Sequence, residues 1–297
     1  MKNLQEWSII RFDEPEISTK KALRMKRQTL LLFAMTFFLI LMCLTMDAEA
    51  DDMATAEAVN NSELNNDESA EKAREIMQYI DDLWRGGSSK ATIQMTIKTD
   101  RWERNLTMTG WSLGTDYSLV RILSPAREAG TATLKHKNDI YNYLPKTDRT
   151  IKITSGMMMG SWMGSHFTND DLVKESRMAQ DYDQRIVFDG VRDGTDIYEI
   201  QLIPKPDAAV VWGQILFIVR KDDRMPLKAR YYDDAEKLVR TMTFDDFKTM
   251  SDRLLPATMR LTPEDHPGEF TEMIYKDIEF DLDLEPSFFS LRNLRSP

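Results

Sequence analysis

Apolar and polar side chains alternate along most of this chain. In the stretch KATIQMTIKT, residues 90–99, Ala91, Ile93, Met95 and Ile97 share one side of an extended backbone, and polar side chains occupy the other. Similar runs, separated by turn signals, occur at 104–113, 117–123, 131–137, 139–144, 149–153, 184–189, 195–203, 209–220, 226–233, 237–248, 254–261 and 270–280. Strands this closely spaced, with hardly any helix between them, predict an antiparallel all-β meander that curls into a barrel or half-barrel.

A helix is predicted before the first strand. Apolar residues at spacings of three and four share one helical face: Ala73, Ile76, Met77, Ile80, Leu83 and Trp84. Gly86 and Gly87 should end this helix, because glycine tolerates the left-handed conformation of a C-terminal cap.

Several predicted strands carry large apolar or aromatic residues on both faces. Examples are Trp111 with Leu113, Tyr141 with Tyr143, and VVWGQILFIV at 210–219. A flat sheet wetted on one side does not need this pattern. A curved sheet with a helix against one face and a hollow interior does.

The segment MMMGSWMGSHFTNDDL, residues 157–172, interrupts the strand pattern. Methionine is unbranched and repacks easily around irregular apolar partners, and glycines are unfavourable in a segment that only fills a core. We therefore interpret the segment as a hinged flap or plug over an apolar interior. Ordinary core packing is the alternative.

The N-terminal residues carry the features of a secretory signal. Met25-Lys26-Arg27 precedes an apolar run at 30–46, which is followed by Ala48-Glu49-Ala50. This predicts a signal peptide over 25–50, cleaved after Ala50, and a periplasmic protein. The alternative is an inner-membrane anchor formed by 30–46.

The same reasoning divides the rest of the chain. Residues 1–24 are too long and too mixed in charge for an ordinary signal, so we expect a non-native extension with the true start at Met25. Residues 51–66 are acidic and Asn-rich, which predicts a disordered tether. Residues 67–297 are expected to form a single domain.

Composition and spacing argue against several functions. The formal net charge of the 297 residues is −10 and no basic stripe is present, so nucleic acid is not an expected partner. The single cysteine, Cys43, lies in the apolar run, which leaves the mature chain without disulfides or a thiol nucleophile. His136, His166 and His266 lack the spacing of metal ligands, so no metal or other cofactor is expected.

Catalytic motifs are also missing. Residues 160–164, Gly-Ser-Trp-Met-Gly, resemble a hydrolase elbow, but the serine is misplaced and the chain has no βαβ pattern. Ser165 and His166 are adjacent, so their side chains point apart. Asp170 and Asp171 fit the first turn of a helix capped by Thr168 or Asn169. We expect no catalytic residues and no enzyme activity; a lipid hydrolase is the enzymatic alternative.

Three stretches together resemble the outer-membrane lipoprotein-sorting family, an exported bacterial, LolA/LolB-like group. They are LSPAREAGTATL at 123–134, YNYLPKTDRTIKI at 141–153 and SGMMMGSWMGSHFTNDDL at 155–172. The helix EIMQYIDDLWRG at 75–86 resembles the opening helix of the family, and the resemblance covers roughly residues 70–297.

The resemblance implies a mainly β fold with a few helices. Its core would be an incomplete antiparallel barrel of about eleven strands wrapped around a long helix, with short helices plugging the open side. In the better-known relatives the cavity holds lipoprotein acyl chains. No residue here matches their cargo-gating arginine individually; Arg85, Arg127 and Arg149 are candidates by charge and position.

We therefore predict a monomeric periplasmic carrier that binds acyl chains of a lipoprotein or lipid and hands them toward the outer membrane. Because similar proteins are associated with exporters of the resistance-nodulation-division (RND) type, a non-transporting accessory subunit of such an inner-membrane exporter is the alternative. The residues expected to line the cavity and flap are Met77, Ile80, Trp84, Met95, Trp111, Tyr141, Tyr143, Met158, Trp162, Met163 and Trp212.

Overall fold

The structure is a computed structural model that describes residues 67–174, 178–206, 208 and 210–296. The predicted extension, signal peptide and tether lie outside the described residues.

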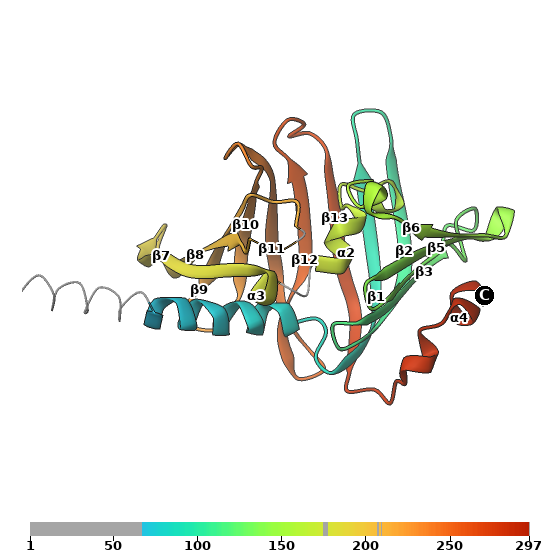
Figure 1. The fold of residues 1–297 in the computed structure, drawn as a ribbon, viewed down its shortest axis with the longest axis horizontal. Coiled ribbons are helices and arrows are strands. Elements are labelled where there is room, and N and C mark those ends of the chain that lie inside the picture. The colour runs from blue at the N-terminus through green and yellow to red at the C-terminus, as the bar shows by residue number, and fades with distance from the viewer. Residues whose placement is uncertain (1–66, 175–177, 207, 209, 297) are drawn as a thin grey trace, which may run out of the picture. The chain divides into compact units, whose positions relative to one another are not determined.

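The described chain is dominated by one antiparallel sheet of thirteen strands (Figure 1). In chain order they are β1 (Ser88–Lys98), β2 (Glu103–Leu113), β3 (Tyr117–Ser124), β4 (Ala132–His136), β5 (Asp139–Leu144), β6 (Arg149–Ile153), β7 (Tyr182–Arg192), β8 (Thr195–Pro204), β9 (Gln214–Arg220), β10 (Pro226–Tyr232), β11 (Leu238–Met250), β12 (Arg253–Pro263) and β13 (Phe270–Phe280). The predicted mainly β, open-barrel class is confirmed. The expected count of about eleven is corrected to thirteen, because every alternating run pairs as a strand of its own, including the short β5 and β6.

Two meanders make up the sheet. Strands β1–β6 form one and β7–β13 the other, and they join where β1 pairs with β13. The order of strands places β6 and β7 at opposite edges although they are consecutive in the chain. The connection between them, residues 154–181, must therefore cross from one edge to the other.

We call this connection the insert. Its short helices are η2 (Ser155–Met157), η3 (Trp162–Gly164), α2 (Asn169–Lys174) and α3 (Met178–Asp181). The predicted capping of α2 is present: the Asp171 backbone N–H donates to Thr168 Oγ1 at 3.2 Å, and the Thr168 N–H donates to Asp171 Oδ2 at 2.7 Å.

A helix over residues 67–82 packs against the face of the sheet that we call the inner face. Its buried residues repeat at helical spacing: Ala73, Ile76, Met77, Ile80 and Leu83. Gly86 follows with φ 56°, and its N–H donates to the Asp82 carbonyl at 3.0 Å. The glycine thus ends this N-terminal helix as the sequence predicts.

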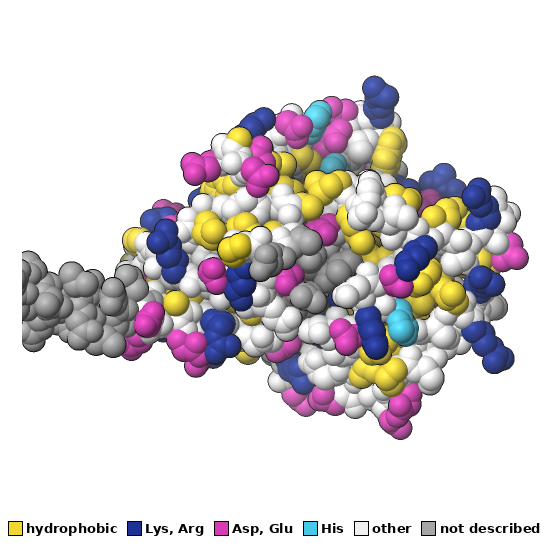
Figure 2. Space-filling view, in the orientation of Figure 1, with side chains coloured by type: hydrophobic (Ala, Val, Ile, Leu, Met, Phe, Trp, Pro, Cys, Tyr) yellow, Lys and Arg dark blue, Asp and Glu magenta, His cyan; other side chains and the backbone are white. Residues whose placement is uncertain are grey.

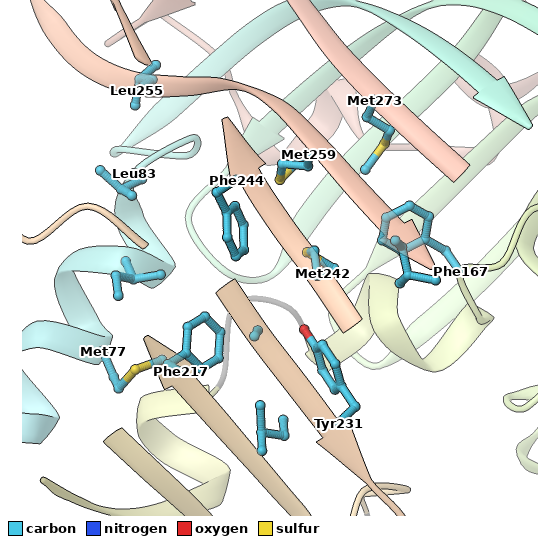
Figure 3. Packing of buried hydrophobic residues seen from close by; sticks show 14 of the residues in the cluster. Met77, Leu83, Phe167, Phe217, Tyr231, Met242, Phe244, Leu255, Met259 and Met273 are labelled. Atoms are coloured by element: carbon cyan, nitrogen blue, oxygen red, sulfur yellow. The ribbon is translucent and has the colours of Figure 1, made fainter. Parts of the chain in front are cut away.

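The main core lies between the N-terminal helix and the inner face (Figure 3). Met77 and Leu83 of the helix meet side chains from the second meander, among them Phe217 of β9 and Phe244 of β11. Ile93 and Met95 of β1 belong to the same core. Residues of both meanders are therefore buried against one helix, which holds the two halves of the sheet together.

The C-terminal segment covers part of the other, outer face. It contains η4 (Pro286–Phe288) and α4 (Leu291–Arg295), and Phe289 and Leu294 are fully buried. They pack on Leu119, Ala132 and Leu134 of β3 and β4. These three side chains point to the outer face, because they alternate along their strands with residues of the inner face. A further short helix, η1 (Pro145–Thr147), connects β5 to β6.

Candidate functional site

A cavity of about 190 Å³ lies between the C-terminal part of the N-terminal helix and the inner face of the sheet. Both meanders contribute to its lining. The apolar and aromatic residues around it are Ile80, Trp84, Ala91, Ile93, Gly110, Trp111, Val120, Phe167, Leu172, Met178, Trp212, Ile215, Phe217, Met242, Phe244, Met259 and Tyr275. The polar residues are Asp81, Arg85, Ser89, Ser112, Ser118, Asp170, Asp171, Tyr182 and Tyr231.

Trp84 forms a fixed aromatic wall of the cavity. Its ring stacks on Phe244 and Tyr275, with centroid distances of 6.0 and 6.2 Å. Its Nε1 donates to the Pro256 carbonyl at 3.3 Å. Rings held on two sides keep their orientation, so this wall is preformed and apolar.

The insert supplies another wall. Phe167, Leu172 and Met178 line the cavity from this segment, and Phe167 is 6% exposed. Figure 3 shows Phe167 beside the second meander, near Met242. Because the insert links the two edge strands, its displacement would open the cavity without breaking any strand pairing.

A buried ion pair ties the insert to β11. Arg240 Nη1 and Nη2 donate to the two carboxylate oxygens of Asp171 at 2.8 and 2.6 Å. The guanidinium also lies 4.2 Å from the ring centroid of Trp212 and 4.3 Å from that of Tyr231. Burial acts to lower the pKa of Arg240, but the Asp171 carboxylate outweighs this and raises the pKa above its ordinary value.

Other contacts hold the insert to both meanders. Trp162 is 3% exposed, and its Nε1 donates to Thr133 Oγ1 of β4 at 3.0 Å. His166 contacts the second meander at β13, in the middle of the sheet, with Nδ1 2.8 Å from Thr271 Oγ1 and Nε2 3.2 Å from Glu269 Oε2. The insert therefore bridges the two halves of the sheet through polar contacts as well as apolar ones.

The sequence-predicted residues fall into three environments. Ile80, Trp84 and Trp212 line the cavity. Met77, Met95 and Trp162 are buried in the main core, with Met163 half-buried against it. Met158 packs beside Ile140, Ile153 and Leu172 in a smaller cluster.

Three predicted residues have their side chains elsewhere. Tyr141 and Tyr143 pack in the outer-face cluster under the C-terminal segment and do not line this cavity. Trp111 borders the cavity, but its ring packs on Phe288, with centroids 5.7 Å apart. Gly110 and Ser112, the neighbours of Trp111 in β2, line the cavity on the inner face. Because successive side chains of a strand point to opposite faces, the ring of Trp111 lies on the outer face.

Sequence reasoning missed most of the wall from the second meander. Phe217, Tyr231, Met242, Phe244, Met259 and Tyr275 all line the cavity. Their signal is the apolar alternation of these strands, which marks a buried face but not the cavity. Arg240 was also missed, because its partner Asp171 is 69 residues away in sequence.

The features considered for catalysis have structural partners. Ser165 Oγ donates to the Trp162 carbonyl at 2.7 Å, and His166 is engaged with Thr271 and Glu269. In the part of the chain that the structure describes, no group of three or more His, Cys, Asp or Glu side chains is placed to hold a metal ion. No helix within those same residues has the length and hydropathy needed to span a membrane.

The surface seen in Figure 2 has acidic and basic side chains interspersed, with hydrophobic side chains between them. This face therefore carries no continuous basic stripe of the kind that binds nucleic acid.

Comparisons with known proteins agree with the fold. No curated protein matches the sequence. A solved domain from Vibrio parahaemolyticus, assigned to the outer membrane lipoprotein-sorting proteins, is 29% identical, covers 76% of this chain and 100% of its own, and has a TM-score of 0.67. A DUF1329 family protein from Desulfovibrio piger is 22% identical, with coverage of 76% and 99% and a TM-score of 0.68.

A LolA superfamily protein from Nitrosomonas europaea is 21% identical, with coverage of 74% and 98% and a TM-score of 0.64. These likenesses confirm the predicted resemblance to the LolA-like lipoprotein-sorting group. A family model described as that of an uncharacterized protein matches residues 114–296, more than half of the sequence. The chain therefore belongs to the family that this model describes, and its fold is that of the LolA-like outer-membrane lipoprotein-sorting proteins.

Proposed function

We propose that the protein is a periplasmic, non-enzymatic carrier that binds acyl chains of a lipoprotein or lipid and passes them toward the outer membrane. One observation carries the proposal: a cavity with apolar and aromatic lining is walled in part by the insert, the segment that connects the two edge strands of the sheet. The likeness to the lipoprotein-sorting domain from Vibrio parahaemolyticus supports it.

The size of the cavity bears on how the carrier works. At about 190 Å³ it is smaller than the roughly 300–1,000 Å³ of ordinary ligand sites. A long acyl chain therefore requires the cavity to widen. We infer that the insert moves outward for loading, since it can be displaced without breaking the strand pairing, while its Trp162 and Phe167 leave the core.

Release is the harder step for a carrier. Each buried methylene contributes about 0.8 kcal/mol, so a fully enclosed long chain would be held very tightly. When the insert closes, its contacts with Thr133, Thr271 and Arg240 form again. We infer that re-forming them offsets part of the binding energy and favours an emptied, closed state.

The export of the chain is part of the same proposal. The signal peptide over 25–50 would deliver it to the periplasm, where donor and acceptor lie in opposite membranes.

Native mass spectrometry of the chain purified from a periplasmic fraction without detergent tests the proposal. We expect a discrete added mass that extracts as acyl lipid. A clean apo mass that stays unchanged after incubation with lipid vesicles and lipopeptides would contradict the carrier function. If that apo protein also bound an RND-type exporter, the accessory-subunit alternative would replace it.

A further inference from the structure

Part of the cavity is lined by a row of three serine hydroxyl groups on adjacent strands. Ser89 of β1 pairs with Ser112 of β2, which pairs in turn with Ser118 of β3. The neighbouring row one step further along the same face is Ala91, Gly110 and Val120. All three serines line the cavity. We call them the serine row.

The serine row has donor capacity left for a ligand. Ser89 Oγ and Ser112 Oγ are 2.7 Å apart, so one of these hydroxyls donates to the other. Each hydroxyl carries one hydrogen, and the second hydrogen of the pair is not used in this contact. A hydroxyl pair of this kind can donate to an acceptor in the cavity.

A cation flanks the serine row on the helix side. Arg85 follows the N-terminal helix and lines the same cavity. Its Nη1 is buried and has no hydrogen-bond partner among the described residues. Buried donors in native proteins are nearly always satisfied, so an unsatisfied guanidinium nitrogen in a cavity wall indicates a missing acceptor.

A second cation lies on the opposite side of the row. Lys135 of β4 pairs with Ser118, which places it next in line on the inner face. It is 5% exposed, and its Nζ donates to the Thr115 carbonyl at 2.7 Å. Lys135 does not line the cavity, so the donors that face it here are Arg85 and the three hydroxyls, a combination that favours a negatively charged acceptor.

The carboxylates of the cavity are engaged with the insert. Asp171 pairs with Arg240, and Asp81 Oδ2 accepts the backbone N–H of Ala179 in α3 at 3.1 Å. Asp170 is itself an insert residue in α2. Two of these acidic residues belong to the insert, and Asp81 lies on the N-terminal helix and binds the insert. None of the acidic residues that line the cavity comes from β1–β3, which carry the serine row.

We propose that Arg85 and the serine row form a head-group subsite that binds a phosphate or carboxylate, so that the preferred cargo is an amphiphile with an anionic head. Its tail would lie along the aromatic wall formed by Trp84 and Phe244. This inference rests on the proposed carrier function and adds the class of cargo.

Calorimetric titration of the purified full chain tests the subsite with matched probes: decyl phosphate, decanoate, decanol and inorganic phosphate. We expect the two anionic amphiphiles to bind about tenfold or more tightly than decanol, as a hydrogen bond to a charged group predicts. Arg85→Gln should abolish this preference and leave the affinity for decanol unchanged. Arg127, another of the arginine candidates from the sequence, has a side chain that is 69% exposed and does not line the cavity. Arg127→Gln is therefore the matched control and should change neither affinity.

Two further variants keep the test decisive if Arg85→Gln folds poorly. Arg85→Lys should retain a preference for anions, and Ser112→Ala should weaken it while the midpoint of thermal unfolding stays close to that of the parent chain. Equal affinity for decanoate and decanol in the parent chain would overturn the subsite but leave the carrier function standing. The subsite also fails if Arg85→Gln weakens decanol as much as decanoate.

The remaining outcomes separate the two proposals. Binding of inorganic phosphate as tight as that of decyl phosphate would support an anion subsite while contradicting a contribution from the acyl chain. If none of the probes binds, the subsite and the carrier function both fail.

Discussion

Replacing Arg240 with methionine should destabilise the protein and loosen the insert. The substitution keeps much of the apolar stem of the side chain but leaves the Asp171 carboxylate, whose side chain is 15% exposed, without its partner. Removing one member of a buried ion pair typically costs about 3–5 kcal/mol. Stacking of the guanidinium on Trp212 and Tyr231 is lost as well. We expect the free energy of unfolding to fall by roughly 3–5 kcal/mol, a large share of the 5–15 kcal/mol of an ordinary domain.

A double substitution separates the ion pair from simple loss of packing. Asp171→Asn combined with Arg240→Met removes both charges, so no unpaired carboxylate stays buried. The double variant should therefore be more stable than Arg240→Met alone. Its loss of stability should be smaller than the sum of the two single losses by about 0.5–3 kcal/mol, the interaction energy typical of directly coupled residues. Lys152→Met is the matched control, because Lys152 pairs with Asp139 at 2.8 Å while both side chains are about half exposed. It should change stability far less.

Urea denaturation measures the stability change, and hydrogen exchange of the insert amides measures its local opening. Relative to the parent chain, Arg240→Met should speed up hydrogen exchange in residues 155–172 more than in β1, because the ion pair fixes the insert and not the strand pairing. If Arg240→Met behaves like Lys152→Met in both assays, this ion pair does not hold the insert closed.

Two further predictions concern the other anchors of the insert. Trp162→Phe removes the N–H donated to Thr133 Oγ1 and should lower the free energy of unfolding by about 0.5–1.5 kcal/mol, whereas Trp162→Ala should lower it by about 3–5 kcal/mol; equal losses in urea denaturation would show that the hydrogen bond dominates. The pKa of Glu269 is lowered by the backbone N–H of Asp100 and then by His166. A lowered carboxyl pKa contributes stability that is present at neutral pH and lost as the pH falls through the folded-state pKa, so parent and Glu269→Gln should converge in thermal stability on acidification. A difference that stays constant from neutral to strongly acidic pH would refute this.

Much of the architecture follows from local pattern. The alternating runs at 104–113 and 270–280 correspond to β2 and β13 almost residue for residue, and Gly86 ends the N-terminal helix. Alternation and helical spacing are set by backbone geometry, so they can be read without knowledge of partners. The same pattern predicted the barrel or half-barrel and the interrupting segment at 157–172. The resemblance added the short helices on the open side, but its strand count was too low.

The face on which each aromatic residue lies could not be read in this way. Tyr141 and Tyr143 alternate as an inner face would, but they lie beneath the C-terminal segment. The sequence offers two apolar faces on these strands, and only the distant residues 288–294 decide which face they cover. A shift of one residue exchanges the two faces, so the period of two by itself cannot make the choice.

The methionines of the insert show the same limit at shorter range. Met158 packs against Ile140 and Ile153, whereas Met157 and Met159 are 41% and 57% exposed. Three identical neighbours thus occupy different environments, because the turn of η2 directs them apart. Composition predicted an unusual, apolar segment correctly, but the individual contacts depend on the backbone path.

Topology explains why the insert, and not the sheet, should control access to the cavity. The edge strands of the sheet are β6 and β7, and each of the other strands is hydrogen-bonded to a neighbour on both sides. Separating two neighbouring strands to widen the sheet would therefore break a whole ladder of backbone hydrogen bonds. Lifting the insert breaks no strand pairing; it exposes Trp162 and Phe167 and breaks side-chain contacts, among them the ion pair of Asp171 with Arg240. Because the free-energy cost of opening lies in the contacts of the insert, a change that weakens them should raise the rates of both loading and release, whereas a substitution in the strand ladder should act mainly on global stability.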